Sequence, residues 1–178
     1  FEFARALGAR LLHLRPLAPE GRGRDLDASW ALTPDDCVRL YLLAELLDAY
    51  GPDAPRVQVD LVQTDGLEEA KRQFALLDPA SPPQTLSDAV NPLVLDADGK
   101  CYPFSYGIDA TLTVADISHG VTAATFRPNA ALMARLADLL EATFAQAASE
   151  SLPFVDWFAL LTRMSRARPR VATPGTRR

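Results

Sequence analysis

The chain has 178 residues, of which 48% are hydrophobic and 23% charged, and its net charge is −5. These values are typical of one large globular domain or two small ones. No apolar run approaches the roughly 18 residues of a membrane-spanning helix, so the sequence predicts no such helix. Cys37 and Cys101 are the only cysteines, which excludes a disulfide framework and a four-cysteine zinc site.

Strands and helices alternate in the first part of the chain, residues 1–78. Thr33 is a preferred N-cap and Pro34 suits the first helical position, so a helix starts there. The run at 56–63 alternates polar and apolar residues, which is typical of a strand. Because a helix separates two strands, the strands are predicted to pair in parallel. The expected elements are helices at 1–8, 34–50 and 66–77, and strands at 9–15 and 56–63.

A proline-rich linker at 79–92 is predicted to separate this part from a second module at 93–166. The run LVLDADGKCYPFSYG predicts a β-hairpin with its turn at 96–99. The other elements expected in the module are a strand at 111–117 and helices at 129–148 and 154–165. The sequence therefore predicts an α/β fold: a partial (β/α) barrel segment with parallel strands, followed by a small α+β module with a hairpin and C-terminal helices.

The C-terminal end is strongly basic. Residues 163–178 contain six arginines and no acidic residue. Residues 167–178 also lack aromatic side chains that could stack on bases, so we interpret them as a flexible tail and expect no nucleic-acid partner.

Polar side chains line one face of each predicted parallel strand. His13 and Arg15 share a face of the first strand, and Gln58 and Asp60 share a face of the second. A parallel strand buried on both sides should be apolar on both. Two interpretations stay open: a cavity lined by polar groups at the strand ends, or an edge that water reaches. A buried ion pair between Arg15 and Asp60, without any chemistry, is a third.

A loop after the first strand contains Gly21, Arg22, Gly23 and Arg24. Glycines let backbone N–H groups approach an anion, and arginines are fork-shaped donors. The spacing does not match a phosphate-binding loop or a dinucleotide motif. An anion or substrate loop that uses Arg22 and Arg24 and an ordinary flexible loop both stay open.

Several runs together resemble the C-terminal part of radical S-adenosylmethionine proteins. The late strands, loop and helix of the family's incomplete (β/α) barrel are similar to three runs of this sequence: FARALGARLLHLRPLAPEGRGRDL, LTPDDCVRLYLLAELL and VQVDL. NPLVLDADGKCYPFSYGID and LTVADISHG resemble the hairpin (SPASM or twitch) module appended to many members, and PFVDWF resembles its closing helix. Versions with an auxiliary cluster carry a cysteine after the proline. Here Phe104 follows Pro103, so the resemblance is to a degenerate module.

The resemblance implies a four-iron, four-sulfur cluster and S-adenosylmethionine in a longer parent protein. The family motif C-x-x-x-C-x-x-C, which supplies three thiolates, is absent from this sequence. This chain is then expected to hold no metal or cofactor by itself and to be inactive alone. It would supply part of the barrel wall and a module on the substrate side. His13, Arg15, Gln58 and Asp60 would lie near the cofactor, and Arg22 and Arg24 would lie at the mouth of the barrel. Since it begins at Phe1, we interpret it as a fragment.

The same interpretation predicts the partners. The expected partners are the rest of the parent chain and a peptide or small-molecule substrate, and no membrane partner is expected. The expected location is the cytoplasm. The alternative is a non-catalytic module that binds a peptide or partner. An exposed sheet edge would favour pairing with a second copy as a homodimer.

Overall fold

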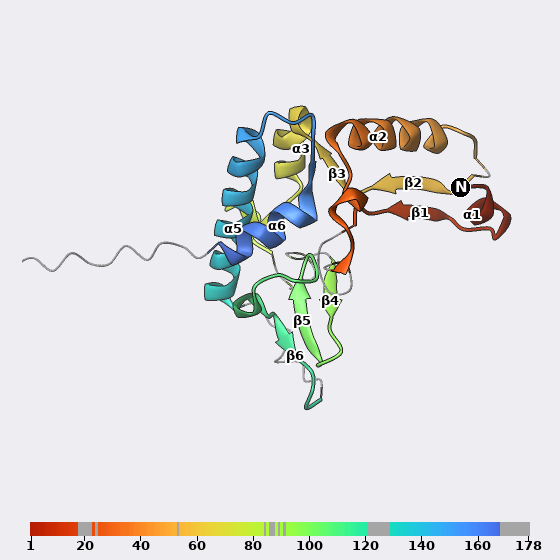
Figure 1. Cartoon of the computed structure of the whole chain (residues 1–178). Helices are drawn as coiled ribbons and strands as arrows, with labels where there is room; N and C mark the ends of the chain where they lie inside the picture. Colours follow the sequence, from red (N-terminus) through yellow and green to blue (C-terminus); the bar gives the residue numbers. More distant parts are fainter. Residues whose placement is uncertain are drawn as a thin grey trace, which may run out of the picture.

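The computed structural model describes residues 1–17, 23, 25–52, 54–83, 85, 88, 90, 92–120 and 129–167. Within these residues the fold is mixed α/β with small sheets (Figure 1). The helices are α1 (Glu2–Ala6), α2 (Pro34–Asp48), α3 (Leu67–Arg72), α5 (Ala130–Ser149) and α6 (Trp157–Arg166). The strands are β1 (Leu11–Leu14), β2 (Arg56–Val59), β3 (Leu61–Gln63), β4 (Leu93–Leu95), β5 (Lys100–Pro103), β6 (Ala115–Asp116) and β7 (Phe154–Asp156). No helix among the described residues combines the length and apolar character needed to cross a membrane.

The βαβ unit, made of β1, α2 and β2, confirms the predicted parallel pair. His13 lies opposite Gln58 in the register, and α2 lies along the pair (Figure 1). α2 starts with a capping box in which the Thr33 hydroxyl accepts from the Asp36 N–H and the Asp36 carboxylate accepts from the Thr33 N–H. The prediction of a partial barrel goes further than the structure, which has a parallel sheet of two strands in its described part.

The predicted strand at 56–63 is broken at Asp60. β2 before the break pairs with β1, and β3 after it pairs antiparallel with β7. The Asp60 N–H still donates to the Leu14 carbonyl at 3.1 Å, so the break comes after the last bond of the parallel ladder. β7 occupies a segment where the sequence predicted the start of the last helix. That helix begins later because Asp156 caps it through the Ala159 N–H.

The hairpin of the second module is confirmed. β4 and β5 pair antiparallel, and β6 adds a third strand in place of the longer one expected at 111–117. Gly99 in the turn has a φ of +77°, and a Cβ there would lie 2.9 Å from the Ser118 backbone. Only glycine meets both conditions without strain.

The C-terminal core is formed mainly by α5, α6 and the loops around the hairpin. Leu136, Leu140 and Leu161 are fully buried, and Trp157 packs against Phe144 with ring centroids 4.5 Å apart. This core includes residues from both sides of the predicted linker at 79–92, because side chains of α3 and of the turn Ala75–Leu77 pack against it. Apolar side chains between Val62 and Leu77 therefore join the core of the C-terminal helices.

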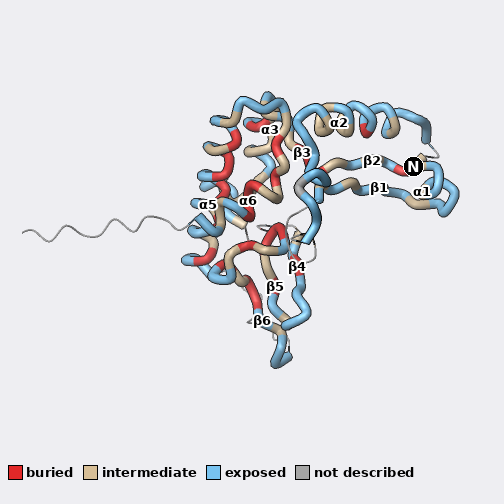
Figure 2. The backbone as a smooth tube through the Cα atoms, viewed as in Figure 1, coloured by how far each residue is buried: buried red, intermediate tan, exposed pale blue. Residues whose placement is uncertain are grey.

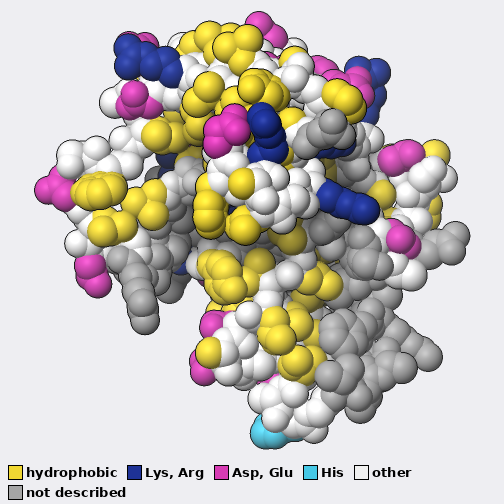
Figure 3. Space-filling model, turned by 90° about the vertical axis from the view of Figure 1, so that its right-hand side faces the viewer, with side chains coloured by type: hydrophobic (Ala, Val, Ile, Leu, Met, Phe, Trp, Pro, Cys, Tyr) yellow, Lys and Arg dark blue, Asp and Glu magenta, His cyan; other side chains and the backbone are white. Residues whose placement is uncertain are grey.

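The βαβ unit has almost no core of its own. Of the residues of α2, Ala44 is buried, and Leu42, Leu43 and Leu46 are exposed (Figure 2). Figure 3 views the molecule from the side of this unit and shows hydrophobic side chains spread over the surface. A folded chain rarely leaves this much apolar surface in water without a partner for it.

Two leucine substitutions should separate these environments. Leu140→Ala, at a side chain with 0% exposure, should lower the free energy of unfolding by about 2–5 kcal/mol, because it leaves a cavity in the C-terminal core. Leu46→Ala, at a helical leucine with 71% exposure, should change it by less than about 0.5 kcal/mol. Urea unfolding of both variants measures the difference. Equal losses would contradict the assignment of the core.

Candidate functional site

The Asp60 carboxylate lies at the carboxyl ends of β1 and β2, where ligands bind in parallel α/β folds. Its side chain has 5% exposure. His13 Nε2 lies 2.6 Å from Oδ1, in a hydrogen bond, and Arg15 Nε lies 2.6 Å from Oδ2. The pleat of β1 places His13 and Arg15 on one face, so both reach the same carboxylate.

Oδ2 of Asp60 has an unusual environment. It is buried and accepts no hydrogen bond from the described residues. Its partner is the Arg15 guanidinium, which forms an ion pair with it. The guanidinium also lies over the Phe158 ring, with Cζ 4.6 Å from the centroid, in a cation–π contact. The Arg15 guanidinium therefore supplies the positive charge that compensates this buried oxygen.

Asp156 brings a second carboxyl group to this place. Leu61 pairs with Asp156 in the sheet of β3 and β7, which sets Asp156 beside the neighbouring Asp60. Burial raises the pKa of Asp156, and the charge of Asp60 raises it further, while the Ala159 N–H and Arg15 oppose the shift. No Lys, Arg or His of the described residues forms an ion pair with Asp156.

The two carboxyl groups share a small cavity of about 220 Å³, called here the carboxylate cavity. Its walls come from the end of β1, the β2–β3 break, the loop after β5 and the first turn of α6. The lining residues are Arg15, Pro16, Asp60, Ser105, Tyr106, Asp156, Phe158 and Ala159. Its wall thus carries two acidic side chains and one basic one.

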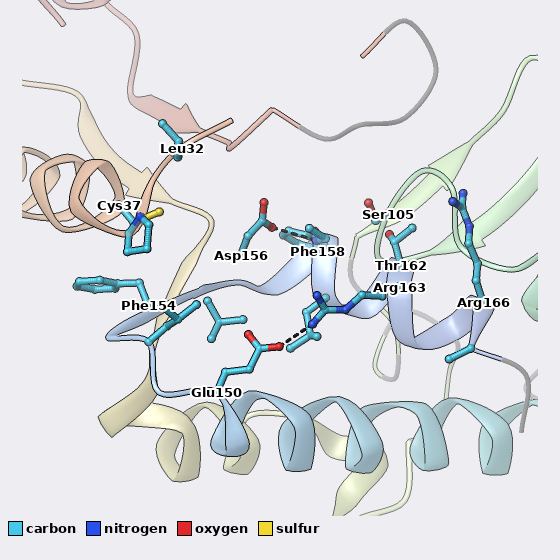
Figure 4. A pocket seen from close by; sticks show the side chains of 16 residues that line it. Leu32, Cys37, Ser105, Glu150, Phe154, Asp156, Phe158, Thr162, Arg163 and Arg166 are labelled. Atoms are coloured by element: carbon cyan, nitrogen blue, oxygen red, sulfur yellow. Dashed lines mark hydrogen bonds and ion pairs between the residues drawn. The ribbon is translucent and has the colours of Figure 1, made fainter. Parts of the chain in front are cut away.

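A larger pocket of about 810 Å³, called here the apolar groove, adjoins this cavity. The two share Ser105, Asp156, Phe158 and Ala159 as wall residues. Figure 4 shows the groove between the start of α2, β7 and α6, with Leu32 and Phe154 on its sides. Its charged residues include Glu150 and Arg163, which form an ion pair of 2.6 Å with each other.

The structure brings together three of the four predicted strand residues. His13, Arg15 and Asp60 meet, whereas Gln58 is exposed and its side chain forms no hydrogen bond with the described residues. Arg22 and Arg24 lie outside the described residues, so the proposed anion loop stays a prediction.

Asp156 and its role beside Asp60 were not predicted from the sequence. One signal was available, because aspartate before a helical apolar pattern is a preferred N-cap. Its pairing with a residue nearly a hundred positions earlier could not be predicted from local sequence.

Metal ligands are not gathered in the described part of the chain. No group of three or more His, Cys, Asp or Glu side chains there could hold a metal ion. Cys37 is on α2 and Cys101 is buried in β5. Burial raises the pKa of Cys37, and Asp156 and Asp36 add to the shift, which disfavours the thiolate that metals need.

Comparisons with known proteins give no match. No family model, no curated protein and no solved structure is significantly similar to this chain.

Asp156 should make stability depend on pH. Because its pKa is raised in the folded state, the folded chain binds this proton more tightly than the unfolded chain does. The carboxyl group therefore lowers the free energy of unfolding as pH rises from its ordinary pKa of about 3.9 through the raised value. Asp156→Asn keeps an N-cap oxygen but cannot ionise. The variant should match the wild type below this window and be more stable above it.

The matched control is Asp109→Asn, which changes another helix cap. Hydrogen bonds from Thr111 lower the pKa of Asp109, so this carboxylate stabilises the fold above its ordinary pKa and the contribution is lost as pH falls. Asp109→Asn should therefore be less stable than the wild type at neutral pH. Urea unfolding across a pH series measures both. If the wild type became more stable than Asp156→Asn as the pH rises, the raised pKa of Asp156 would be contradicted.

Proposed function

We propose that this chain is the C-terminal portion of a radical S-adenosylmethionine enzyme. In this proposal it supplies part of the (β/α) barrel wall and a substrate-side module and is not catalytic alone. The iron–sulfur cluster and S-adenosylmethionine belong to a preceding part of the parent protein. His13, Arg15 and Asp60 would face the interior of the completed barrel.

The observation that carries the proposal is the exposed apolar surface of the βαβ unit. In a barrel, each βαβ unit is flanked by further strands and helices. Among the described residues β1 pairs with β2 alone, and Leu42 and Leu46 of α2 are exposed. In a completed barrel, exposed leucines of this kind would pack against neighbouring helices. The surface therefore supports a role as part of a larger α/β assembly.

Two further features agree with the proposal. The polar residues of β1 and the β2–β3 break lie at the carboxyl ends of the strands, the end that carries the active site in barrel enzymes. The hairpin of β4 and β5 is present where the resemblance predicts one. The protein's part of such chemistry is to bind and orient, since the cofactor carries the difficult step.

The residues of this chain do not fit the cluster itself. A four-iron cluster of this family needs three thiolates, and the chain has two cysteines, which lie in α2 and β5. Under the proposal, the ligands must come from elsewhere in the parent protein.

The decisive experiment uses the protein encoded by the complete reading frame. The segment before Phe1 should contain C-x-x-x-C-x-x-C, and anaerobic reconstitution with iron and sulfide should produce the absorption and electron paramagnetic resonance of a four-iron cluster. The 178-residue chain, treated in the same way, should take up no cluster. A complete protein without the motif, or without iron after reconstitution, would contradict the proposal.

A second candidate function is a non-catalytic module that binds a peptide or a second copy. It is favoured by β4, an edge strand with Leu93 and Leu95 exposed. Sedimentation equilibrium tests the dimer: a monomer at all concentrations would count against pairing through this edge, and a dimer disrupted by Leu95→Pro would support it. Leu95 is a useful position because its N–H faces away from β5, so proline removes a donor of the free edge and leaves the hydrogen bonds of the hairpin in place.

A further inference from the structure

Ser105 carries a hydroxyl group that no described residue binds. The residue has 7% exposure and lines both the apolar groove and the carboxylate cavity. On the same groove wall, the Thr162 hydroxyl donates to the Tyr106 carbonyl, whereas Ser105 Oγ forms no hydrogen bond with the described residues. Unlike Asp60 Oδ2, this unpartnered oxygen keeps some accessible surface. Because buried hydroxyl groups normally have a partner, the Ser105 hydroxyl is available to a ligand.

The backbone before Ser105 has an unusual conformation. Phe104 has a φ of +65° and is the one non-glycine residue with positive φ among the described residues. The Ser105 N–H donates to the Pro103 carbonyl at 2.8 Å, which closes a three-residue turn of a rare and strained type. The core fixes this turn, because Phe104 has 1% exposure and its N–H donates to the Pro92 carbonyl. Strained residues are concentrated at ligand sites, and this one holds Ser105 where the two cavities meet.

The charges on the wall of the apolar groove balance. Two of its charged residues are acidic and two are basic: Glu150, Asp156, Arg163 and Arg166. Glu150 and Arg163 are paired with each other at 2.6 Å. Asp156 accepts a hydrogen bond from the Ala159 N–H at the start of α6, the end of a helix that favours a negative charge. The wall thus has no excess charge to compensate an ion, and it suits a neutral ligand.

The size and lining of the groove match those of sites for small molecules. Its volume of about 810 Å³ lies within the usual range of such sites, roughly 300–1,000 Å³. Figure 4 shows Ser105 and Thr162 toward one end of the groove, and Cys37 and Phe154 toward the other. Apolar side chains such as Leu152 and Phe154 line much of its length. A ligand that fits has an apolar body and one polar group at the Ser105 end.

We propose that the apolar groove binds a small neutral molecule whose carbonyl oxygen accepts a hydrogen bond from the Ser105 hydroxyl and whose apolar body lies against Phe154 and Phe158. A carbonyl oxygen accepts without donating, so it satisfies the free O–H and brings no further donor into the groove. The site goes beyond the radical enzyme proposed above and does not rest on it, because every wall residue belongs to this chain.

The first test compares three probes of similar shape and different charge. Acetophenone, benzoate and 1-phenylethylammonium are titrated into the 178-residue chain and followed by amide chemical shifts in NMR. Acetophenone should shift Ser105 and the start of α6 and leave the turn at 96–99 unchanged. Both ions should bind at least about tenfold more weakly, because an apolar wall without excess charge does not replace their hydration. Shifts centred elsewhere, or an ion that binds as tightly as acetophenone, would overturn the proposal.

The second test removes the hydroxyl. Ser105→Ala should keep the free energy of unfolding, since the hydroxyl has no partner among the described residues. It should weaken the binding of acetophenone about two- to tenfold, the effect of one neutral hydrogen bond. Ethylbenzene has the same shape without the carbonyl and should bind the wild type and the variant equally. An unchanged affinity for acetophenone, or an equal loss for both probes, would overturn the proposal.

Two further variants are the controls. Ser149→Ala removes an exposed hydroxyl outside the groove and should keep both affinities. Ala159→Phe fills the wall that the two cavities share and should abolish the binding of both probes. Circular dichroism verifies that the variants are folded. Binding that survives Ala159→Phe would overturn the proposal, and if a variant does not fold, the shift map of the wild type decides. None of these outcomes affects the test of the iron–sulfur cluster.

Discussion

The position of Asp60 links the two parts of this molecule. At this residue the chain leaves the parallel pair of β1 and β2 and enters the antiparallel pair of β3 and β7. A carboxylate that is 5% exposed at such a break would be costly without partners. His13 and Arg15 supply them from β1. Their contacts hold the βαβ unit against the C-terminal core at the same point where a ligand would meet the strand ends.

The distribution of apolar side chains is a consequence of this arrangement. The core is concentrated around α5 and α6, and α3 contributes to it from the first part of the chain. The βαβ unit lies to one side of this core with most of its leucines in contact with water. Such a unit is stable only when further elements cover it, because a two-stranded sheet and one helix bury little surface. Its exposure therefore supports a larger assembly, whichever chain completes it.

Charge is arranged differently in the two pockets. The carboxylate cavity has an excess of acidic groups, and Arg15 is the one cation among its wall residues. The apolar groove pairs Glu150 with Arg163 and is otherwise mainly apolar. Together they form a surface that is polar at one end and apolar along its length, the pattern of sites that orient a ligand through a few polar groups. The raised pKa of Asp156 is a consequence of the same burial.

The sequence by itself determined the local structure. The cap at Thr33, the alternation in 56–59 and the turn at 96–99 each depend on neighbours a few residues away, and the structure has a helix, a strand and a hairpin there. It also determined that His13, Arg15 and Asp60 share a polar face, because the pleat fixes side-chain direction. Only the tertiary structure decided that the second strand breaks at Asp60, that 154–156 form a strand, and that Asp156 joins the site. These features depend on contacts between residues almost a hundred positions apart, and no local pattern carries the free energy of such contacts.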